Sequence, residues 1–154
     1  MTTFTVVDDL APLVDGTDWA EVELTEGRGR GIAVWFALAP SPTGADPIAA
    51  LERLTARPDP LLAPVAEYGV DDGEGYVVWS GTLDETLAAL SGPLTMAEIV
   101  SLADVVLAGF ERLHAAGFVH PRLGPDVVRL VPDDEGRVVP EVLGFGLPWG
   151  DRTT

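Results

Sequence analysis

Glycine and proline divide this chain into short segments, and this division limits the fold more than any other feature of the sequence. The 154 residues include 17 Gly and 13 Pro. Proline inside a helix removes a backbone hydrogen bond and clashes with the preceding turn, and glycine favours turns and helix ends. The longest segment suited to a helix runs from Met96 to about Ala116, before Gly117. Short strands and short helices are therefore expected around one long helix.

Several segments have the alternating or apolar pattern of β-strands. Apolar and polar residues alternate over residues 19–24, and a more fully apolar run follows over residues 32–39. Gly27, Gly29 and Gly31 separate these segments and predict a hairpin. Further strands are expected over residues 62–68, 75–79, 127–131 and 138–143. Residues 1–17 are expected to form a short strand or a loose arm.

Capping patterns predict three helices. Asp46 followed by Pro47 is a favourable helix start, and this helix should cover residues 47–56. Two Thr-x-x-Glu capping boxes precede a short helix over residues 83–90 and the long helix over residues 96–116. The boxes are Thr82–Glu85 and Thr95–Glu98. Together with the strands, these helices place residues 1–154 in the α+β class as a single domain, with no visible internal repeat.

Four absent residue types exclude whole classes of chemistry. The chain has no Lys, Asn, Gln or Cys, and all nine of its basic residues are Arg. A Schiff-base lysine, a cysteine nucleophile, a disulfide and a thiolate metal site are therefore excluded. Because His114 and His120 are the only histidines, a histidine-rich metal site is excluded as well. We expect no metal and no cofactor.

The charge balance is strongly acidic, with a formal net charge of −16. Nucleic acids and anionic membranes repel such a surface, so neither is an expected partner. Solubility is the simplest reason for the charge, and mimicry of nucleic acid by an acidic inhibitor is an alternative. No apolar stretch approaches the roughly 20 residues of a membrane span, and no leader pattern opens the chain. A cytoplasmic location is expected.

The last third of the chain carries a spacing typical of one family. Residues 113–120 read Leu-His-Ala-Ala-Gly-Phe-Val-His, and residues 121–130 read Pro-Arg-Leu-Gly-Pro-Asp-Val-Val-Arg-Leu. Residues 143–147 read Leu-Gly-Phe-Gly-Leu. This series resembles the HRD, catalytic-loop and DFG motifs of protein kinases with their polar residues replaced. It is most similar to bacterial kinases of the eukaryotic Ser/Thr type.

The resemblance implies a minimal kinase-like organisation. An N-lobe-like antiparallel sheet with one helix is expected over about residues 1–79. A truncated C-lobe of two helices and a β-hairpin is expected over about residues 80–150, and residues 151–154 would form a tail. The sequence ends soon after Gly-Phe-Gly, so an activation segment, a substrate groove and further C-lobe helices are not expected.

The catalytic polar residues of the family fall on other residue types here. The phosphate-binding lysine of the third strand falls on Trp35, whose ring is expected to occupy the former phosphate site. The catalytic aspartate and the lysine that follows it fall on Arg122 and Gly124. The metal-binding asparagine and the DFG aspartate fall on Val127 and Gly144. Because phosphoryl transfer requires magnesium and a cation to neutralise phosphate charge, the resemblance implies an inactive pseudokinase and not an enzyme.

The glycine-rich turn is the candidate for residual nucleotide binding. It consists of Gly27, Arg28, Gly29, Arg30 and Gly31. In kinases such a loop covers the nucleotide phosphates, and the two arginines could supply positive charge. The alternative function is therefore a sensor that binds nucleotide without hydrolysing it. A flexible hairpin tip explains the same residues more simply.

Apolar residues share one face of the long helix, since each residue turns the helix by ~100°. Later C-lobe helices cover much of this face in a complete kinase, so part of it should be exposed unless a partner covers it. The candidate interface residues are Leu102, Val106, Phe110, Leu113 and Trp149. A protein partner or a second copy of the chain is the expected occupant, and cover from Phe145 and Trp149 is the alternative. The leading interpretation is a protein-binding regulatory scaffold.

Isolated polar residues have structural explanations. We expect His120 to be a hydrogen-bonded core histidine and not a catalytic base. Arg122 is expected to pair with Asp126 or Glu141. Candidate phosphorylation sites are Thr43, Thr153 and Thr154.

Overall fold

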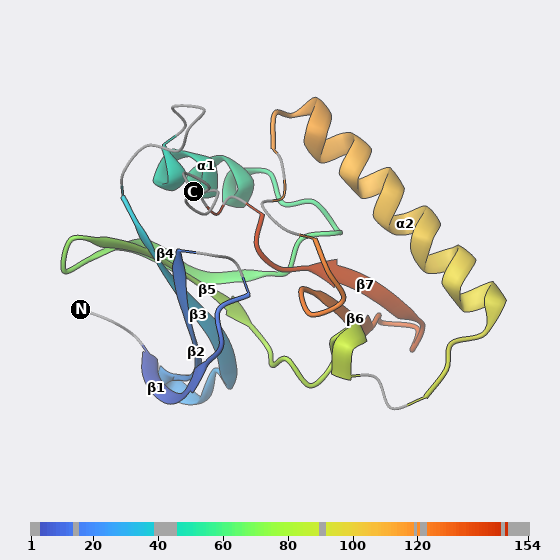
Figure 1. Cartoon of the computed structure of the whole chain (residues 1–154), viewed down its shortest axis with the longest axis horizontal. Coiled ribbons are helices and arrows are strands. Elements are labelled where there is room, and N and C mark those ends of the chain that lie inside the picture. Colours follow the sequence, from blue (N-terminus) through green and yellow to red (C-terminus); the bar gives the residue numbers. More distant parts are fainter. Residues whose placement is uncertain are drawn as a thin grey trace.

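A five-stranded antiparallel sheet forms the N-terminal part of the computed structural model, which describes residues 4–13, 16–38, 46–89, 92–118, 120, 123–145 and 147. The strands follow one another in the order β1-β2-β3-β5-β4 (Figure 1). Their bounds are β1 Phe4–Leu10, β2 Thr17–Leu24, β3 Arg30–Ala37, β4 Val65–Asp71 and β5 Glu74–Ser80. The strands predicted for this part are confirmed, and the N-terminal segment forms an edge strand paired with β2 instead of a loose arm.

The sheet has an apolar cluster on each face because successive side chains of a strand point to opposite sides. Val34 and Phe36 of β3 belong to the main core, which faces the rest of the molecule. Ala33 and Trp35 belong to an outer cluster with Phe4 on the opposite face. The pairing of β3 with β2 and β5 fixes this division, since a slip of one residue would exchange the faces.

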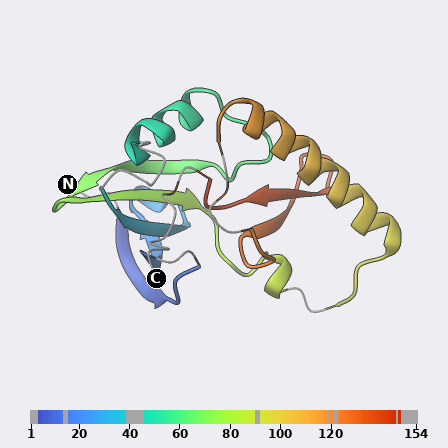
Figure 2. The same ribbon diagram turned by 45° about the horizontal axis from the view of Figure 1, so that its top comes forward.

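Helix α1 (Pro47–Ala56) covers the core face of the sheet (Figure 2). It begins as predicted, because the Asp46 carboxylate accepts a hydrogen bond of 3.0 Å from the backbone N–H of Ile48. Leu51 and Leu54 are buried on its inner side. The predicted helix over residues 47–56 is therefore confirmed in position and in its cap.

Helix α2 (Met96–Ala115) lies along a hairpin of β6 (Val128–Pro132) and β7 (Val138–Val142) (Figures 1 and 2). The predicted capping box is present, with Thr95 and Glu98 each accepting a backbone hydrogen bond from the other. Among the described residues, no helix is long and apolar enough to cross a membrane.

The predicted helix over residues 83–90 is wrong. The described part of this segment contains only a 3-10 turn over Leu87–Ala89. Thr86 forms a β-bridge with Arg129, and the backbone carbonyl of Glu85 accepts a 2.7 Å hydrogen bond from Leu130. Pairing with β6 therefore takes the backbone groups that a helix would use. In the described residues the C-terminal part has one α-helix and not two.

Candidate functional site

Apolar side chains fill the space between the sheet and the C-terminal part around Val127, which the resemblance aligns with a metal-binding asparagine. The indole rings of Trp19 and Trp79 stack with centroids 5.9 Å apart on the core face of the sheet. Val127, Leu143 and Leu147 of the C-terminal part are buried in the same cluster. We call these five residues the joint core. It joins the sheet to the C-terminal part by direct apolar packing.

Trp35 lies on the other face of the sheet. Its ring packs beside Phe4, with centroids 6.0 Å apart, in the outer cluster. The prediction that this ring occupies the former phosphate site is therefore wrong. The strand pairing turns Val34 and Phe36 toward the core instead, and neither side chain can neutralise a phosphate.

Three other positions aligned with catalytic residues have structural roles here. Val127 is completely buried in the joint core, and its carbonyl accepts a 2.8 Å hydrogen bond from Leu143. Gly144 is buried with a φ of 104°, and a Cβ there would lie 2.9 Å from Nε2 of His120. Gly124 lines a groove beside α2.

His120 is a buried core residue, as predicted. Its Nε2 lies 2.7 Å from the carbonyl oxygen of Leu143. A carbonyl can only accept, so Nε2 carries the hydrogen and donates it. The ring also meets Phe145 edge to face, with centroids 5.0 Å apart. These contacts fix the loop that contains Gly144.

The glycine-rich turn follows β2 and includes the first two residues of β3, and it lies outside the joint core. It begins with a 3-10 turn over Thr25–Gly27, and all of its residues except Gly31 are exposed. A Cβ at Gly27 or Gly29 would meet nothing within 4 Å. Arg30 is paired with Glu21, and this hydrogen bond raises the pKa of the guanidinium. The structure therefore does not bring the turn to the region where a cleft was expected.

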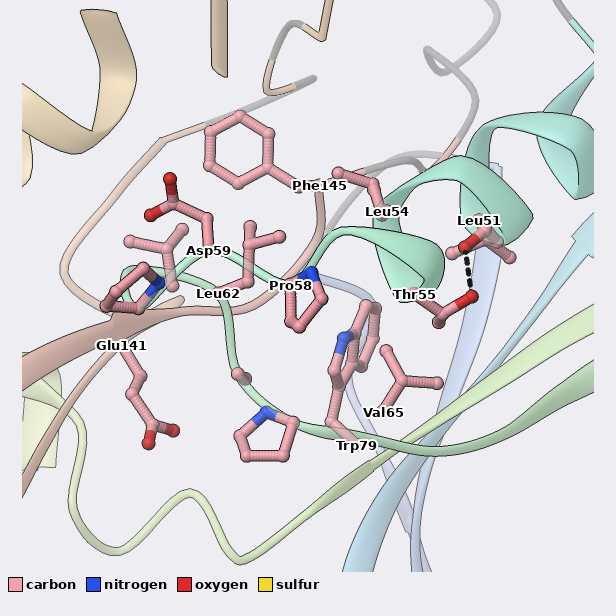
Figure 3. Close-up of a pocket in the computed structure, with 14 residues that line it drawn as sticks. Leu51, Leu54, Thr55, Pro58, Asp59, Leu62, Val65, Trp79, Glu141 and Phe145 are labelled. Atoms are coloured by element: carbon pink, nitrogen blue, oxygen red, sulfur yellow. Dashed lines mark hydrogen bonds between the residues drawn. The ribbon is translucent and has the colours of Figure 1, made fainter. Parts of the chain in front are cut away.

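A cavity of about 560 Å³ lies beneath α1 (Figure 3). Most of its lining is apolar, and Figure 3 shows the Trp79 ring rising from β5 toward Pro58. Two carboxylates belong to the lining, and each has a cationic partner. Asp59 accepts hydrogen bonds of 2.8 and 2.9 Å from Arg112, which lower its pKa. Glu141 accepts one of 2.9 Å from Arg129.

A groove of about 490 Å³ runs between α2 and the β6–β7 hairpin. Leu102 and Val106, two of the candidate interface residues, line it and are half-buried. Phe110 packs edge to face on Phe145 at 5.3 Å, and Leu113 is buried. The placement of Leu113 on a free interface is therefore wrong, because the core beneath α2 already covers it.

Sequence reasoning missed four leucines that line the groove from outside α2. They are Leu87, Leu94, Leu123 and Leu130, and Leu123 is 49% exposed. An apolar residue next to Gly124 and Pro125 in a loop was the available signal, since loops at the surface are usually polar.

Several predicted residues lie outside the described part of the chain. They are Arg122, Trp149, Thr43, Thr153 and Thr154. The described residues contain no group of three or more His, Asp or Glu side chains placed to hold a metal ion.

Comparison with known proteins shows the fold. No protein-family model matches the chain, and no curated protein matches its sequence. The crystal structure of Rad53 1-466 in complex with AMP-PNP is similar, with a TM-score of 0.65 and 17% sequence identity. The match covers 94% of this chain and 39% of the Rad53 chain. The chain therefore has a kinase-like fold over less than half the length of that protein.

Proposed function

We propose that this chain is a catalytically inactive, kinase-like scaffold that binds another protein. The joint core is the observation that carries the proposal. Trp19, Trp79 and Leu143 are each at most 3% exposed and pack in one apolar cluster with Val127, which the resemblance aligns with the metal-binding asparagine of kinases. A nucleoside triphosphate would have to displace these side chains.

The chemistry of this region supports the absence of catalysis. Phosphoryl transfer depends on metal ions and cations that balance the phosphate charge. The cluster that contains the joint core consists of apolar side chains, and burying phosphate charge there would be very costly. A kinase lysine or asparagine is absent at every alignment, because the sequence has neither residue type.

Exposed apolar surface on α2 supports the scaffold role. Met96 and Leu107 are 74% and 66% exposed, and both lie on one flank of the helix. Contiguous apolar surface of this kind marks sites of protein interaction. The nucleotide-sensor alternative places phosphates at Gly27–Gly31, where the charge of Arg30 is already paired with Glu21.

Thermal unfolding with ATP and with ADP, each with and without magnesium, tests the inactive state. A ligand present at 100 times its Kd would stabilise the fold by about 2.7 kcal/mol, so binding would clearly raise the unfolding midpoint. We expect no shift and no transfer of radiolabelled phosphate to a basic protein substrate. A saturable shift that Arg28→Ala removes would favour the sensor, and measurable transfer would overturn the proposal.

A further inference from the structure

We propose that the groove between α2 and the β6–β7 hairpin binds a cationic amphipathic helix of another protein. This inference rests on the proposed scaffold function and names its partner and its surface.

The groove has the shape and lining of a helix-binding site. On α2, Ile99, Leu102 and Val106 follow the spacing of one helical face. Leu130 of β6 and Leu123 of the preceding loop face them across the groove. Ile99 and Leu123 are 47% and 49% exposed, so both are accessible to a ligand.

The apolar surface continues from the groove onto the flank of α2. Met96, Val100 and Leu107 lie there, separated by about one and two helical turns, and all three are exposed. An occupant wider than the groove could therefore bury further apolar surface. Amphipathic helices bind in this way, with side chains at positions i, i+3, i+4 and i+7.

Carboxylates lie at one end of this apolar surface and along its flank on α2. At one end, a second hollow shares Leu94 and Leu130 with the groove and is lined by Asp84, Glu85 and Glu98. Asp104 and Glu111 are exposed on α2, next to the apolar flank in the helical projection.

Among the described residues, the positive charge of Arg137 beside this hollow is already paired. Arg137 adjoins Val138 in sequence, and Val138 lines the same hollow. The guanidinium of Arg137 lies 3.2 Å from the Asp133 carboxylate and 3.0 Å from the Glu135 carboxylate. The rim is therefore complementary to a partner rich in Lys or Arg.

The backbone around the hairpin favours a helix over an extended strand. On the β6 side, Leu130 donates to the carbonyl of Glu85 at 2.7 Å. On the β7 side, Val142 donates to Leu61 at 2.7 Å and accepts from Ala63 at 3.2 Å. Strand addition needs free edge groups, whereas a helix binds through its side chains alone.

Charge also argues against a second copy of this chain as the occupant. Each copy carries a net charge of −16, and two acidic rims would face one another across such an interface. Like charges brought together in this way repel. A cationic partner gains from the same charges.

The test uses a fluorescent helical peptide of about 18 residues, or five turns, with Leu on one face and Lys elsewhere. One control peptide has Glu in place of every Lys. A second has the Lys/Leu composition in an order that places Leu on no single face. Fluorescence anisotropy measures binding to the full chain at low and at high salt.

Matched variants locate the binding site. The pair Ile99→Ser and Leu123→Ser removes apolar surface from exposed positions, and Val70→Ser is its control on β4, where Val70 is 56% exposed. The pair Asp84→Asn and Glu85→Gln removes rim charge. Its control is the pair Asp71→Asn and Glu74→Gln, which removes equal charge beside the β4–β5 turn. Circular dichroism checks that every variant is folded.

We expect the Lys/Leu peptide to bind, and the Ile99/Leu123 pair of changes to weaken it about tenfold or more. The Asp84/Glu85 pair should weaken binding several-fold and reduce its salt dependence, and both controls should bind as the unmodified chain does. The proposal is overturned if the Lys/Leu peptide does not bind, if the Glu peptide or the reordered peptide binds equally, or if the Ile99/Leu123 changes have no effect.

Two further measurements separate the remaining outcomes. If sedimentation shows a dimer that the Ile99/Leu123 changes dissociate, a second copy occupies the groove and the proposal is wrong. Nucleotide binding or phosphate transfer would contradict the scaffold function itself. Absence of peptide binding together with absence of nucleotide binding would contradict only this assignment of the groove.

Discussion

The guanidinium of Arg129 donates a hydrogen bond of 2.6 Å to the backbone carbonyl of Ser80, which joins β6 to the end of β5. Its other terminal nitrogen donates to Glu141 at 2.9 Å, and the Arg129 side chain is only 3% exposed. Gly81 makes room for it, because a Cβ there would lie 2.1 Å from Nη1. A buried cation therefore fixes the segment between the sheet and the C-terminal part.

Arg129→Met should destabilise the fold by about 3–5 kcal/mol, because it leaves the Glu141 carboxylate and the Ser80 carbonyl without their buried donor. Urea unfolding followed by circular dichroism measures this loss. Glu141→Gln is the milder control, since an amide oxygen can still accept from Arg129. If Arg129→Met lowers the free energy of unfolding less than Glu141→Gln does, the guanidinium does not hold the sheet and the C-terminal part together.

Gly109→Ala should destabilise the fold by about 1–3 kcal/mol although alanine is the better helix former. A Cβ at this position of α2 would lie 2.4 Å from Cδ2 of Leu61, so the helix and the loop could not approach as they do. Combining it with Leu61→Ala should cost less than the sum of the two single changes, because alanine removes Cγ and Cδ2 of Leu61 and leaves only its Cβ, 2.8 Å away, close to the added methyl group. Additive costs in urea unfolding would contradict this contact, and Gly92→Ala is a control with open space around it.

Local signals in the sequence predicted both α-helices that the structure describes. Asp46 before Pro47, and Thr95 with Glu98, act within one helical turn, so the sequence near each helix start contains all the information required. Strand positions followed from hydrophobic alternation, which is likewise a pattern of neighbouring residues. The kinase-like fold was predicted from the spacing of residues 113–147 and is supported by the structural comparison.

Features that depend on distant pairing could not be predicted in this way. The face on which Trp35 lies depends on the register of β3 against β2 and β5, and one residue of error exchanges the faces. The segment around Glu85 and Thr86 pairs with β6 instead of forming a helix. The groove beside α2 combines residues from the segment before α2, from α2, from the loop before β6 and from the β6–β7 hairpin, so no single stretch of sequence contains it.

Stability should fall between about pH 10 and pH 12 because of Tyr76. Burial and a hydrogen bond with Glu67 raise the pKa of its hydroxyl from 10.0 to about 12. The folded state therefore favours the neutral hydroxyl of Tyr76. The stability that this preference contributes is lost as the pH rises through this range. Tyr76→Phe should remove this part of the alkaline loss in urea unfolding, whereas Tyr68→Phe should retain it. An unchanged alkaline profile in Tyr76→Phe would contradict the assignment.

The ion pair of Asp59 with Arg112 should contribute to stability at neutral pH and lose that contribution in acid. Hydrogen bonding to Arg112 holds the pKa of the Asp59 carboxyl below its usual value of 3.8. The contribution is complete above the unfolded-state pKa and disappears as the pH falls through the lower folded-state value. Arg112→Ala should lower the unfolding midpoint at pH 7, and this deficit should shrink on acidification. A deficit that is the same at pH 7 and at about pH 3 would contradict the pairing.

Trp79→Ala should destabilise the fold by about 3–5 kcal/mol, because it removes a large buried ring from the joint core. Trp35→Ala is the matched control on the outer face, where the ring is only half-buried, and it should cost clearly less. The space left by Trp79 is lined by apolar groups and should accept indole, so added indole should raise the unfolding midpoint of Trp79→Ala alone. ATP should not raise it, since nothing in the apolar cluster would balance the phosphate charge. A larger loss in Trp35→Ala would contradict the placement of Trp79 as the more deeply packed ring, and rescue of Trp79→Ala by ATP would contradict the claim that the apolar cluster excludes phosphate charge.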